Sequence, residues 1–271
     1  MDKKISCVIH TYNSAQYLEQ CLKSVSWCNE IVIIDMYSSD DTLTIARIYN
    51  ANIYMHENMG YADPARAFGL SKCKHDWILA LDSDEIIMPA LAEELKRIML
   101  FDEYDVVKMC RRNFFFGREI SGTGWGYEDQ LIPRFFKKGY IIYGHEVHNF
   151  ITISTAARVG KIIHKNKAVI HFNYDSISHF INKLNLYTDF EAQKKYDGNV
   201  WIGIIYNFIR EVGGRFIIKK GYKDKWLGLY LSLAMAFYRA TAIVKRKLPD
   251  RADVIRRYYK IADDILASNN K

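Results

Sequence analysis

The chain has 271 residues, of which 49% are hydrophobic and 25% are charged. This composition excludes a disordered chain and is enough to bury the core of one large domain, or of one domain with an appendage. The five cysteines have no paired spacing, and an odd number argues against a secreted disulfide framework. The first apolar run becomes polar at His10, too early for a signal-peptide core. We therefore expect a cytoplasmic protein.

Charge is distributed unevenly along the chain. Residues 1–149 hold 16 Lys and Arg against 21 Asp and Glu, a net charge of −5, whereas residues 150–271 hold 22 against 10, a net charge of +12. A basic half attracts nucleic acid, anionic lipid headgroups or a phosphorylated substrate through the same Coulomb interaction. Composition alone leaves these three classes of partner open.

The first hundred residues alternate short apolar runs with helical patterns, which is typical of a parallel sheet covered by helices. Ser14 is a suitable N-cap for the first helix, and Pro89 suits the first turn of the fourth. The predicted strands are residues 5–10, 31–35, 51–55 and 77–82, and the predicted helices are residues 15–26, 42–49, 64–71 and 89 to about 100.

After Tyr104 the pattern changes twice. Two β-like runs, 106–110 and 131–136, flank the segment 114–127, which is rich in glycine and aromatic residues. We expect this segment to be a loop over a binding site. From about His171 onward the chain is helical and basic, with predicted helices over residues 187–195, 201–210, 226–247 and 252–266.

The stretch 226–244 is interrupted by a single strong charge, Arg239, and has basic residues on both sides. It is just long enough to span a bilayer, but an arginine in mid-helix is unfavourable in hydrocarbon. A helix that lies in the membrane interface with its basic ends on headgroups accounts for the same residues. An ordinary packed helix does so too, and the sequence leaves the three alternatives open.

An acidic cluster, Asp82, Ser83, Asp84 and Glu85, follows the apolar run 77–81. If this run is a parallel strand, the cluster lies at its carboxyl end, where open α/β sheets bind ligands. Asp82 and Asp84 are two residues apart, so a turn can direct both carboxylates at one Mg²⁺ or Mn²⁺ ion. Such an ion would stabilise negative charge on a leaving nucleotide. The same short pattern also fits a polar, helix-capping turn.

Polar residues also follow the first two predicted strands. Thr11, Tyr12 and Asn13 follow the first strand, where we expect them to hold a nucleobase or ribose. Asp35 ends the second strand, where it is predicted to accept hydrogen bonds from uracil or ribose. The carboxyl ends of adjacent parallel strands lie at one edge of a sheet, so these groups and the acidic cluster are predicted to form one crevice.

Three motifs, TYN at 11–13, IIDMYSSDDT at 33–42 and LDSDE at 81–85, resemble in order and spacing those of the inverting family 2 glycosyltransferases with the GT-A fold. The likeness extends to a bacterial branch that includes lipopolysaccharide-core glucosyltransferases acting on an inner-core heptose. The segments that carry it are RRNFFFGREI at 111–120, GYEDQLIPRFF at 126–136, GHEVH at 144–148 and HFNYDSISHFINKLNLYT at 171–188.

The resemblance implies an α/β protein with a GT-A-like mixed sheet, flanking helices and a basic helical extension at the C-terminal end. The catalytic domain would comprise residues 1–170, with a nucleotide-sugar half of about 1–110 and an acceptor half of about 111–170. Residues 171–271 would form the extension, for which a membrane surface is one expected partner. The enzyme would then act at the inner face of the cytoplasmic membrane.

The resemblance also implies a nucleotide-diphospho-sugar donor, with UDP expected, a saccharide or lipid-linked saccharide acceptor, and a divalent metal at Asp82 and Asp84. Inversion needs a carboxylate that takes the proton of the acceptor hydroxyl. The family usually supplies it from a Glu-Asp pair after the metal motif, so we assign the base to Asp129, with Glu128 as second choice. Arg134 is predicted to contact the donor diphosphate or to pair with Asp129.

The segment GHEVH is also predicted to line the site, through His145, Glu146 and His148. A histidine there is able to complete the ligand shell of the metal ion. The competing interpretation is a packed, hydrogen-bonded histidine.

Three other functions fit less of the sequence. A nucleotidyltransferase normally has a basic, glycine-rich loop after the first strand, and HTYNSAQY at 10–17 contains neither glycine nor lysine. A nicotinamide dehydrogenase would show G-x-G-x-x-G there. A basic nucleic-acid- or membrane-binding module without enzymatic activity leaves the acids at the strand ends unexplained. We expect no nucleic-acid partner.

Overall fold

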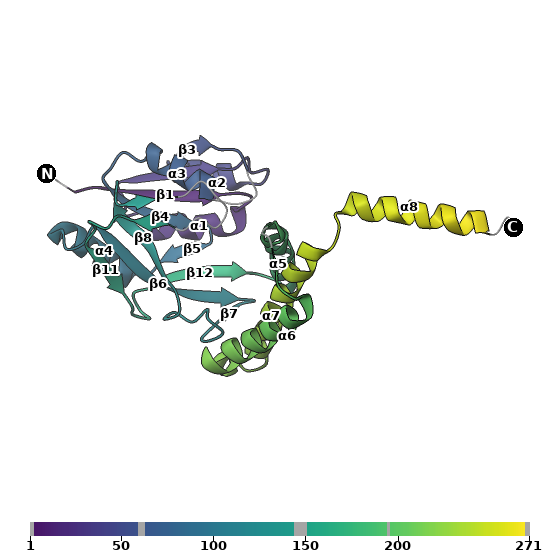
Figure 1. The fold of residues 1–271 in the computed structure, drawn as a ribbon. Coiled ribbons are helices and arrows are strands. Elements are labelled where there is room, and N and C mark those ends of the chain that lie inside the picture. The colour runs from purple at the N-terminus through teal and green to yellow at the C-terminus, as the bar shows by residue number, and fades with distance from the viewer. Residues whose placement is uncertain (1–2, 59–62, 144–150, 194–195, 269–271) are drawn as a thin grey trace. The chain divides into compact units, whose positions relative to one another are not determined.

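The computed structural model describes residues 3–58, 63–143, 151–193 and 196–268 (Figure 1). It divides into two compact units, residues 1–177 and residues 178–271. The first unit contains the sheet and the second is helical. The sheet includes residues up to Tyr174, a few residues beyond the predicted boundary at residue 170.

A mixed sheet of ten strands forms the first unit, in the order β3-β2-β1-β4-β8-β6-β12-β5, with β7 and β11 paired to β6. A separate pair of two-residue strands, β9 and β10, lies outside it. The strands are β1 (Ile5–Thr11), β2 (Glu30–Asp35), β3 (Asn52–Met55), β4 (Trp77–Asp82), β5 (Glu85–Ile87), β6 (Val106–Phe115), β7 (Arg118–Glu119), β8 (Leu131–Lys137), β9 (Ile141–Ile142), β10 (Thr152–Ile153), β11 (Val159–Ile162) and β12 (Val169–Tyr174).

Helices cover both faces of the parallel part of this sheet. Ile5, Cys7 and Ile9 of β1 belong to the core formed with the first, second and fourth helices, whereas Val8 belongs to the core formed with the third. Because both faces are buried, β1 is a continuous apolar run rather than an alternating one. The four helices are α1 (Ala15–Ser24), α2 (Thr42–Ile48), α3 (Asp63–Lys72) and α4 (Pro89–Phe101).

These elements confirm the α/β fold and the alternation predicted for the first hundred residues, within two residues at almost every boundary. The prediction of a loop over 114–127 was partly wrong. β6 continues to Phe115, whose side chain is completely buried, and β7 pairs antiparallel with the end of β6. The first residues of the predicted loop are therefore part of the sheet. The helix predicted to begin at residue 187 begins at Ile177, where Phe180 and Leu184 supply two turns of buried face.

The pairing of the strands determines where the acidic cluster lies. β1 pairs in parallel with β2 and β4, which places Thr11 opposite Asp35 and His10 opposite Asp82. After β4 the chain turns and forms the short strand β5, which pairs antiparallel with β12 so that Glu85 lies opposite His171. The turn from Asp82 to Glu85 therefore joins two separate parts of the sheet.

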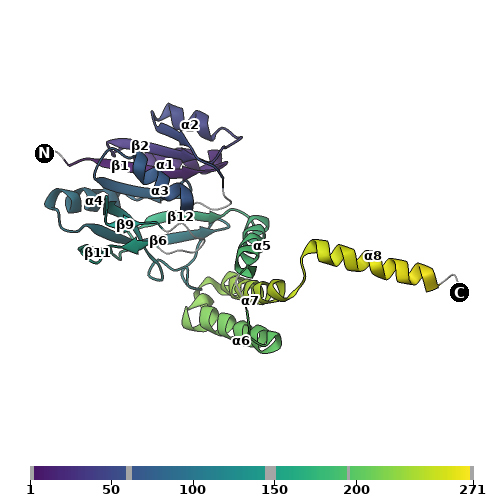
Figure 2. The same ribbon diagram turned by 45° about the horizontal axis from the view of Figure 1, so that its top comes forward.

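The second unit is built on a long central helix (Figure 2). Its first helix, α5 (Ile177–Ala192), begins at the boundary between the units. The elements that follow are α6 (Val200–Val212), the π-helical turn η1 (Gly213–Ile218), the 3₁₀ turn η2 (Gly221–Asp224), α7 (Lys225–Lys247) and α8 (Arg251–Ser268). In the described part of the chain, one helical stretch, Gly221–Lys247, is long and apolar enough to cross a membrane, and 56% of its most apolar window is buried.

Arg239, the single strong charge within the apolar stretch of α7, is paired inside this unit. Its guanidinium lies 3.1 Å from Glu191 of α5 and 3.5 Å from Glu211 of α6. Burying a charge without a partner is unfavourable, and the two carboxylates provide that partner. α7 therefore packs as the central helix of the unit in this structure, which is one of the three alternatives that the sequence left open.

Candidate functional site

Asp82, the last residue of β4, lies between two arginines. Its Oδ1 accepts a hydrogen bond from Nη2 of Arg66 at 2.7 Å, and its Oδ2 forms an ion pair with Arg134. Burial by itself raises the pKa of Asp82, but the charges of Arg134 and Arg66 outweigh it and hold that pKa well below its usual range. Asp82 is therefore a carboxylate whose two oxygens each face an arginine.

Glu85 holds the acidic turn together from the other end. It is completely buried, and it accepts a hydrogen bond from the backbone N–H of Asp82 at 3.0 Å and one from Arg134 at 3.0 Å. The guanidinium of Arg111 lies 3.3 Å from the same carboxylate. A buried charge needs such partners, so Glu85, to which the sequence assigned no role, fixes the shape of the turn.

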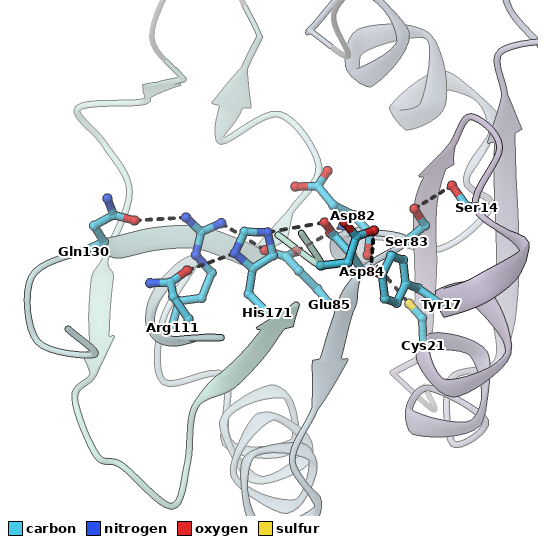
Figure 3. A network of polar contacts seen from close by, with 12 residues as sticks. Ser14, Tyr17, Cys21, Asp82, Ser83, Asp84, Glu85, Arg111, Gln130 and His171 are labelled. Atoms are coloured by element: carbon cyan, nitrogen blue, oxygen red, sulfur yellow. Dashed lines mark hydrogen bonds and ion pairs between the residues drawn. The ribbon is translucent and has the colours of Figure 1, made fainter. Parts of the chain in front are cut away.

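Asp84 points from this turn toward His171 of β12 (Figure 3), with 3.5 Å between its Oδ2 and Nε2 of the imidazole. Nδ1 of His171 lies 2.8 Å from Oδ1 of Asn113, and the amide nitrogen of Asn113 donates to the carbonyl of Trp125 at 2.8 Å. The Asn113 oxygen is thus an acceptor, and Nδ1 of His171 carries the proton. In the neutral imidazole, the lone pair of Nε2 is then directed toward Asp84.

The turn after β2 is held by a buried carboxylate. Asp35 is completely buried, and its Oδ1 accepts hydrogen bonds from the hydroxyls of Thr11 at 2.7 Å and Ser38 at 2.6 Å. Its Oδ2 accepts the backbone N–H of Ser38 at 2.8 Å. Thr11 is also completely buried. In this structure Asp35 and Thr11, two of the four predicted nucleoside ligands, therefore stabilise the loops at the ends of β1 and β2 rather than face solvent.

Two tyrosines at the same edge of the sheet are open to solvent. Tyr12 is 50% exposed and Tyr37 is 63% exposed. Asn13 ties their loops together, because its N–H donates to the hydroxyl of Ser38 at 2.8 Å and its side-chain oxygen accepts the N–H of Ser39 at 2.8 Å. Tyr12 is thus the member of the predicted set 11–13 that presents a ring, and Tyr37 is an aromatic residue that the sequence left without a role.

The predicted base lies in a glycine turn. Asp129 accepts the N–H of Gly126 through Oδ2 at 3.1 Å, and its own N–H donates to the carbonyl of Gly126 at 3.0 Å. A methyl group on Gly126 would lie only 3.0 Å from that carboxylate oxygen. Glu128 is exposed and accepts the hydroxyl of Tyr127 at 2.6 Å. Of the two candidate bases, Asp129 is thus the one whose position the backbone fixes.

Arg111 links this segment to the acidic turn. It donates to Oε1 of Gln130 at 2.9 Å, while its other terminal nitrogen lies near Glu85. Figure 3 shows this chain of contacts from Gln130 through Arg111 to Glu85. The residue after Asp129 is therefore connected through one side chain to the turn that carries Asp82 and Asp84.

The structure brings Asp82, Ser83 and Asp84 into one turn, as the sequence predicted, with the Ser83 hydroxyl donating to Ser14 at 2.8 Å. Arg134 is only 4% exposed, and it pairs with Asp82 and Glu85 rather than with Asp129. The predicted site residues His145, Glu146 and His148 lie outside the described residues.

Metal binding was predicted at Asp82 and Asp84. Within the ranges that the structure describes, no group of three or more His, Cys, Asp or Glu side chains is arranged to hold a metal ion. Asp84 and His171 nevertheless present a carboxylate oxygen and an imidazole nitrogen to one another, a donor set that suits Mn²⁺ or Mg²⁺ completed by water and phosphate oxygens.

Besides the roles of Glu85 and Tyr37, sequence reasoning missed Arg66, Asn113 and His171. His171 stands in a segment that carried the family resemblance, and a histidine there was a usable signal. Nothing in the sequence indicated Arg66, because its partner Asp82 is sixteen residues away on another element.

Comparison with known proteins identifies the family. Residues 6–164 match the family model described as glycosyl transferase family 2. An uncharacterized glycosyltransferase of Rickettsia bellii is 25% identical over 259 residues, which cover 90% of this chain and 86% of that protein. The lipopolysaccharide core biosynthesis glycosyltransferase LpsC of Rhizobium meliloti is 27% identical over 206 residues, which cover 71% of this chain and 72% of that protein.

Among solved structures, S. aureus TarS 1-349 in complex with UDP-GlcNAc is similar with a TM-score of 0.49 and 16% identity, covering 90% of this chain and 89% of that one. The family model spans more than half of the chain, including β1, β2 and β4 and the acidic turn that follows β4. The resemblance seen in the motifs is confirmed: the chain belongs to glycosyl transferase family 2 and is a glycosyltransferase.

Proposed function

We propose that this enzyme transfers a hexosyl group from a UDP-sugar to a hydroxyl group of a saccharide or lipid-linked saccharide, with inversion, in the synthesis of lipopolysaccharide or another cell-surface polysaccharide. The observation that carries the proposal is the acidic turn of a family 2 chain in which Asp84 faces His171. The name of the Rhizobium relative refers to the lipopolysaccharide core, which supports a saccharide acceptor.

The nucleoside of the donor binds at the ends of β1 and β2. Tyr12 and Tyr37 offer exposed rings there, and aromatic faces stack on nucleobases. Asp35 and Thr11 act indirectly, because their mutual hydrogen bond and the contacts of Asp35 with Ser38 hold the loops that carry these rings. The diphosphate extends from there toward the acidic turn.

Asp84 and Nε2 of His171 would hold a divalent cation at this turn, and Asn113 fixes the proton of His171 on Nδ1. Asp82, the other predicted ligand, contributes negative charge beside it, and Arg66 and Arg134 keep that residue ionised. When bound, the cation would neutralise the charge that develops on the leaving diphosphate. Arg134 supports donor binding through Asp82 rather than by direct contact.

Asp129 acts as the base. Its carboxylate takes the proton of the acceptor hydroxyl, the acceptor oxygen forms a bond to the anomeric carbon, and the bond from that carbon to the diphosphate breaks on the opposite face. The turn at Gly126 fixes Asp129 before substrate binds, which limits the reorganisation that the reaction requires.

The reaction is tested by incubating the protein with a panel of nucleotide sugars, Mn²⁺ or Mg²⁺, and oligosaccharide acceptors, and following release of the nucleotide. We expect release with a UDP-sugar, loss of turnover in Asp129→Asn with donor binding retained, and turnover retained in the matched control Glu128→Gln. Turnover that survives Asp129→Asn would refute the base assignment. Release of no nucleotide, together with no donor-dependent thermal shift, would refute the proposed function.

The metal site is tested without measuring activity. His171→Ala should weaken the binding of Mn²⁺, followed by electron paramagnetic resonance of the free ion, whereas His75→Ala should not, because His75 precedes β4 at the opposite end of that strand. Equal Mn²⁺ affinity in the two variants would remove His171 from the site.

The enzyme is proposed to work in the cytoplasm. All five cysteines are free thiols, and Cys7, Cys21, Cys73 and Cys110 are buried. Free thiols are typical of a reducing compartment, in which nucleotide-sugar donors would also be supplied.

A further inference from the structure

The second unit exposes an unusually apolar surface on α6 and η1. Soluble proteins rarely expose large contiguous apolar patches, and those that do generally use them for binding. We call this surface the apolar ridge. It consists of six side chains that are 58–78% exposed: Trp201, Ile202, Ile205, Ile209, Ile217 and Ile218.

The ridge occupies one continuous side of α6. Residues 201, 205 and 209 recur every four positions, so they line one stripe of the helix, and Ile202 and the half-exposed Phe208 widen it. The opposite side of α6 is different, because Gly203 and Glu211 are buried there. Glu211 accepts a hydrogen bond from Arg215 at 2.7 Å and lies 3.5 Å from Arg239 of α7.

α6 therefore packs on α7 through its small and polar side and leaves its apolar side outward. This is the reverse of the usual orientation of a helix in water. An apolar partner on the ridge would remove this surface from water, which is favourable.

Lysines border the ridge where η1 leads into α7. Lys219, Lys220, Lys223 and Lys225 are all exposed, and the exposed ring of Trp226 follows them. In residues 178–271, 18 Lys and Arg stand against 9 Asp and Glu, a net charge of +9. An apolar face with a lysine border complements a bilayer that contains anionic lipids: acyl chains meet the apolar residues and headgroups meet the ammonium groups.

A second copy of this chain fits this surface less well, because two such units, each with a net charge of +9, would repel one another. Tryptophan at a lysine border is instead typical of membrane interfaces. A transmembrane arrangement does not fit this helix, because the 13 residues of α6 and the 6 of η1 include three charged residues, Arg210, Glu211 and Arg215, which are unfavourable in hydrocarbon.

We propose that the apolar ridge and the adjoining lysines bind the surface of an anionic membrane, with α6 lying in the plane of the interface. This assigns membrane contact to α6 and η1, whereas the sequence drew attention to residues 226–247. It goes beyond the transfer reaction, since nothing in the proposed chemistry requires a membrane.

The test uses the full-length protein and flotation with vesicles of phosphatidylcholine alone or mixed with phosphatidylglycerol. Wild type should float with the mixed vesicles and less so as salt is added. Ile205→Glu with Ile209→Glu should weaken binding at least about tenfold. The matched control is Ile48→Glu with Leu100→Glu, which makes the same change of charge at exposed apolar positions of the first unit and should bind like wild type.

Two further variants separate the apolar and electrostatic contributions. Lys219→Gln with Lys223→Gln should weaken binding to the mixed vesicles by about 25-fold, or about fivefold for each charge removed. The mixed vesicles should shift the tryptophan fluorescence of wild type to shorter wavelength, and the double variant Trp201→Phe with Trp226→Phe should lose most of this shift.

Wild type that fails to float, or a ridge variant that binds as tightly as the matched control, would overturn the proposal. So would sedimentation showing a wild-type dimer that the ridge variant converts to monomer without any vesicle binding. UDP-sugar turnover with a soluble acceptor should be equal in the ridge variant Ile205→Glu with Ile209→Glu and in its matched control, so a failure of membrane binding is distinguishable from a failure of the transfer reaction.

Discussion

Replacing Arg134 by methionine is predicted to destabilise the first unit strongly. Arg134 is buried, and it forms ion pairs with two carboxylates, those of Asp82 and Glu85. Glu85 is itself completely buried. Methionine fills a similar volume but removes the charge. Arg111, 3.3 Å away, would then remain as the positive partner of Glu85, and Arg66 as that of Asp82.

The expected loss follows from this burial. Removing one partner of a buried ion pair typically costs about 3–5 kcal/mol, because the other charge stays buried without compensation. For a unit of this size, a loss of that order lowers the melting temperature by roughly 6–20 °C. The double variant Arg134→Met with Glu85→Gln should lose less unfolding free energy than the two single variants lose together, since it removes both charges of one pair.

The assay is thermal and urea unfolding of the full chain without added metal or donor. Arg97→Met is the matched control, because Arg97 is exposed and its ion pairs with Glu94 and Glu103 should contribute little. The reasoning would be refuted if Arg134→Met unfolded at the same temperature as Arg97→Met, or if the double variant lost the full sum of the single losses.

Three other perturbations have definite expected results. A lysine partner holds the pKa of Asp102 at about 2, below the unfolded value of about 3.9, so its stabilising contribution is present above about pH 4 and is lost as the pH falls through about 2. The urea midpoints of wild type and Asp102→Asn should therefore differ near neutral pH and converge in acid. Gly126→Ala crowds Asp129 and should lower kcat roughly 10- to 100-fold in the nucleotide-release assay. Asn113→Ala should weaken Mn²⁺ binding roughly 10- to 100-fold, measured by paramagnetic resonance, because Asn113 orients His171.

Each of these results has a contrary outcome. A midpoint difference that grows in acid would show that the Asp102 carboxylate does not stabilise the folded state. Unchanged kcat in Gly126→Ala would show that the turn does not position the base. Gly213→Ala is the control, because a methyl group there meets nothing within 4 Å. Unaltered Mn²⁺ affinity in Asn113→Ala would show that the tautomer of His171 does not matter for the metal.

Much of the first unit was predictable because its determinants are local. Apolar runs separated by helical patterns define β1 to β4 and α1 to α4. β1, β2 and β4 are buried on both faces and therefore have no polar alternation. The positions of Asp35 and Asp82 at strand ends follow from the same pattern, so their place at one edge of the sheet could be predicted. The three-residue strand β5 could not, because so short a run carries no periodicity.

The second unit shows a different limit. The sequence drew attention to residues 226–247, its longest apolar stretch, as the segment that would meet a membrane. The structure buries much of α7 and leaves the apolar side of α6 exposed. Periodicity shows that a helix has an apolar side, but it does not show whether another helix buries that side.

The sequence by itself determined the family, the alternating β/α order and the placing of Asp82, Ser83 and Asp84 after a strand, because these depend on residue types at short spacing. Tertiary structure alone decided which side chains meet. Asp84 faces His171 only because β5 and β12 pair in one register, and Asp82 lies between Arg66 and Arg134 only because α3 and β8 bring them to the end of β4. Such contacts join residues that are distant along the chain, and strand order and register, which local spacing does not contain, determine them.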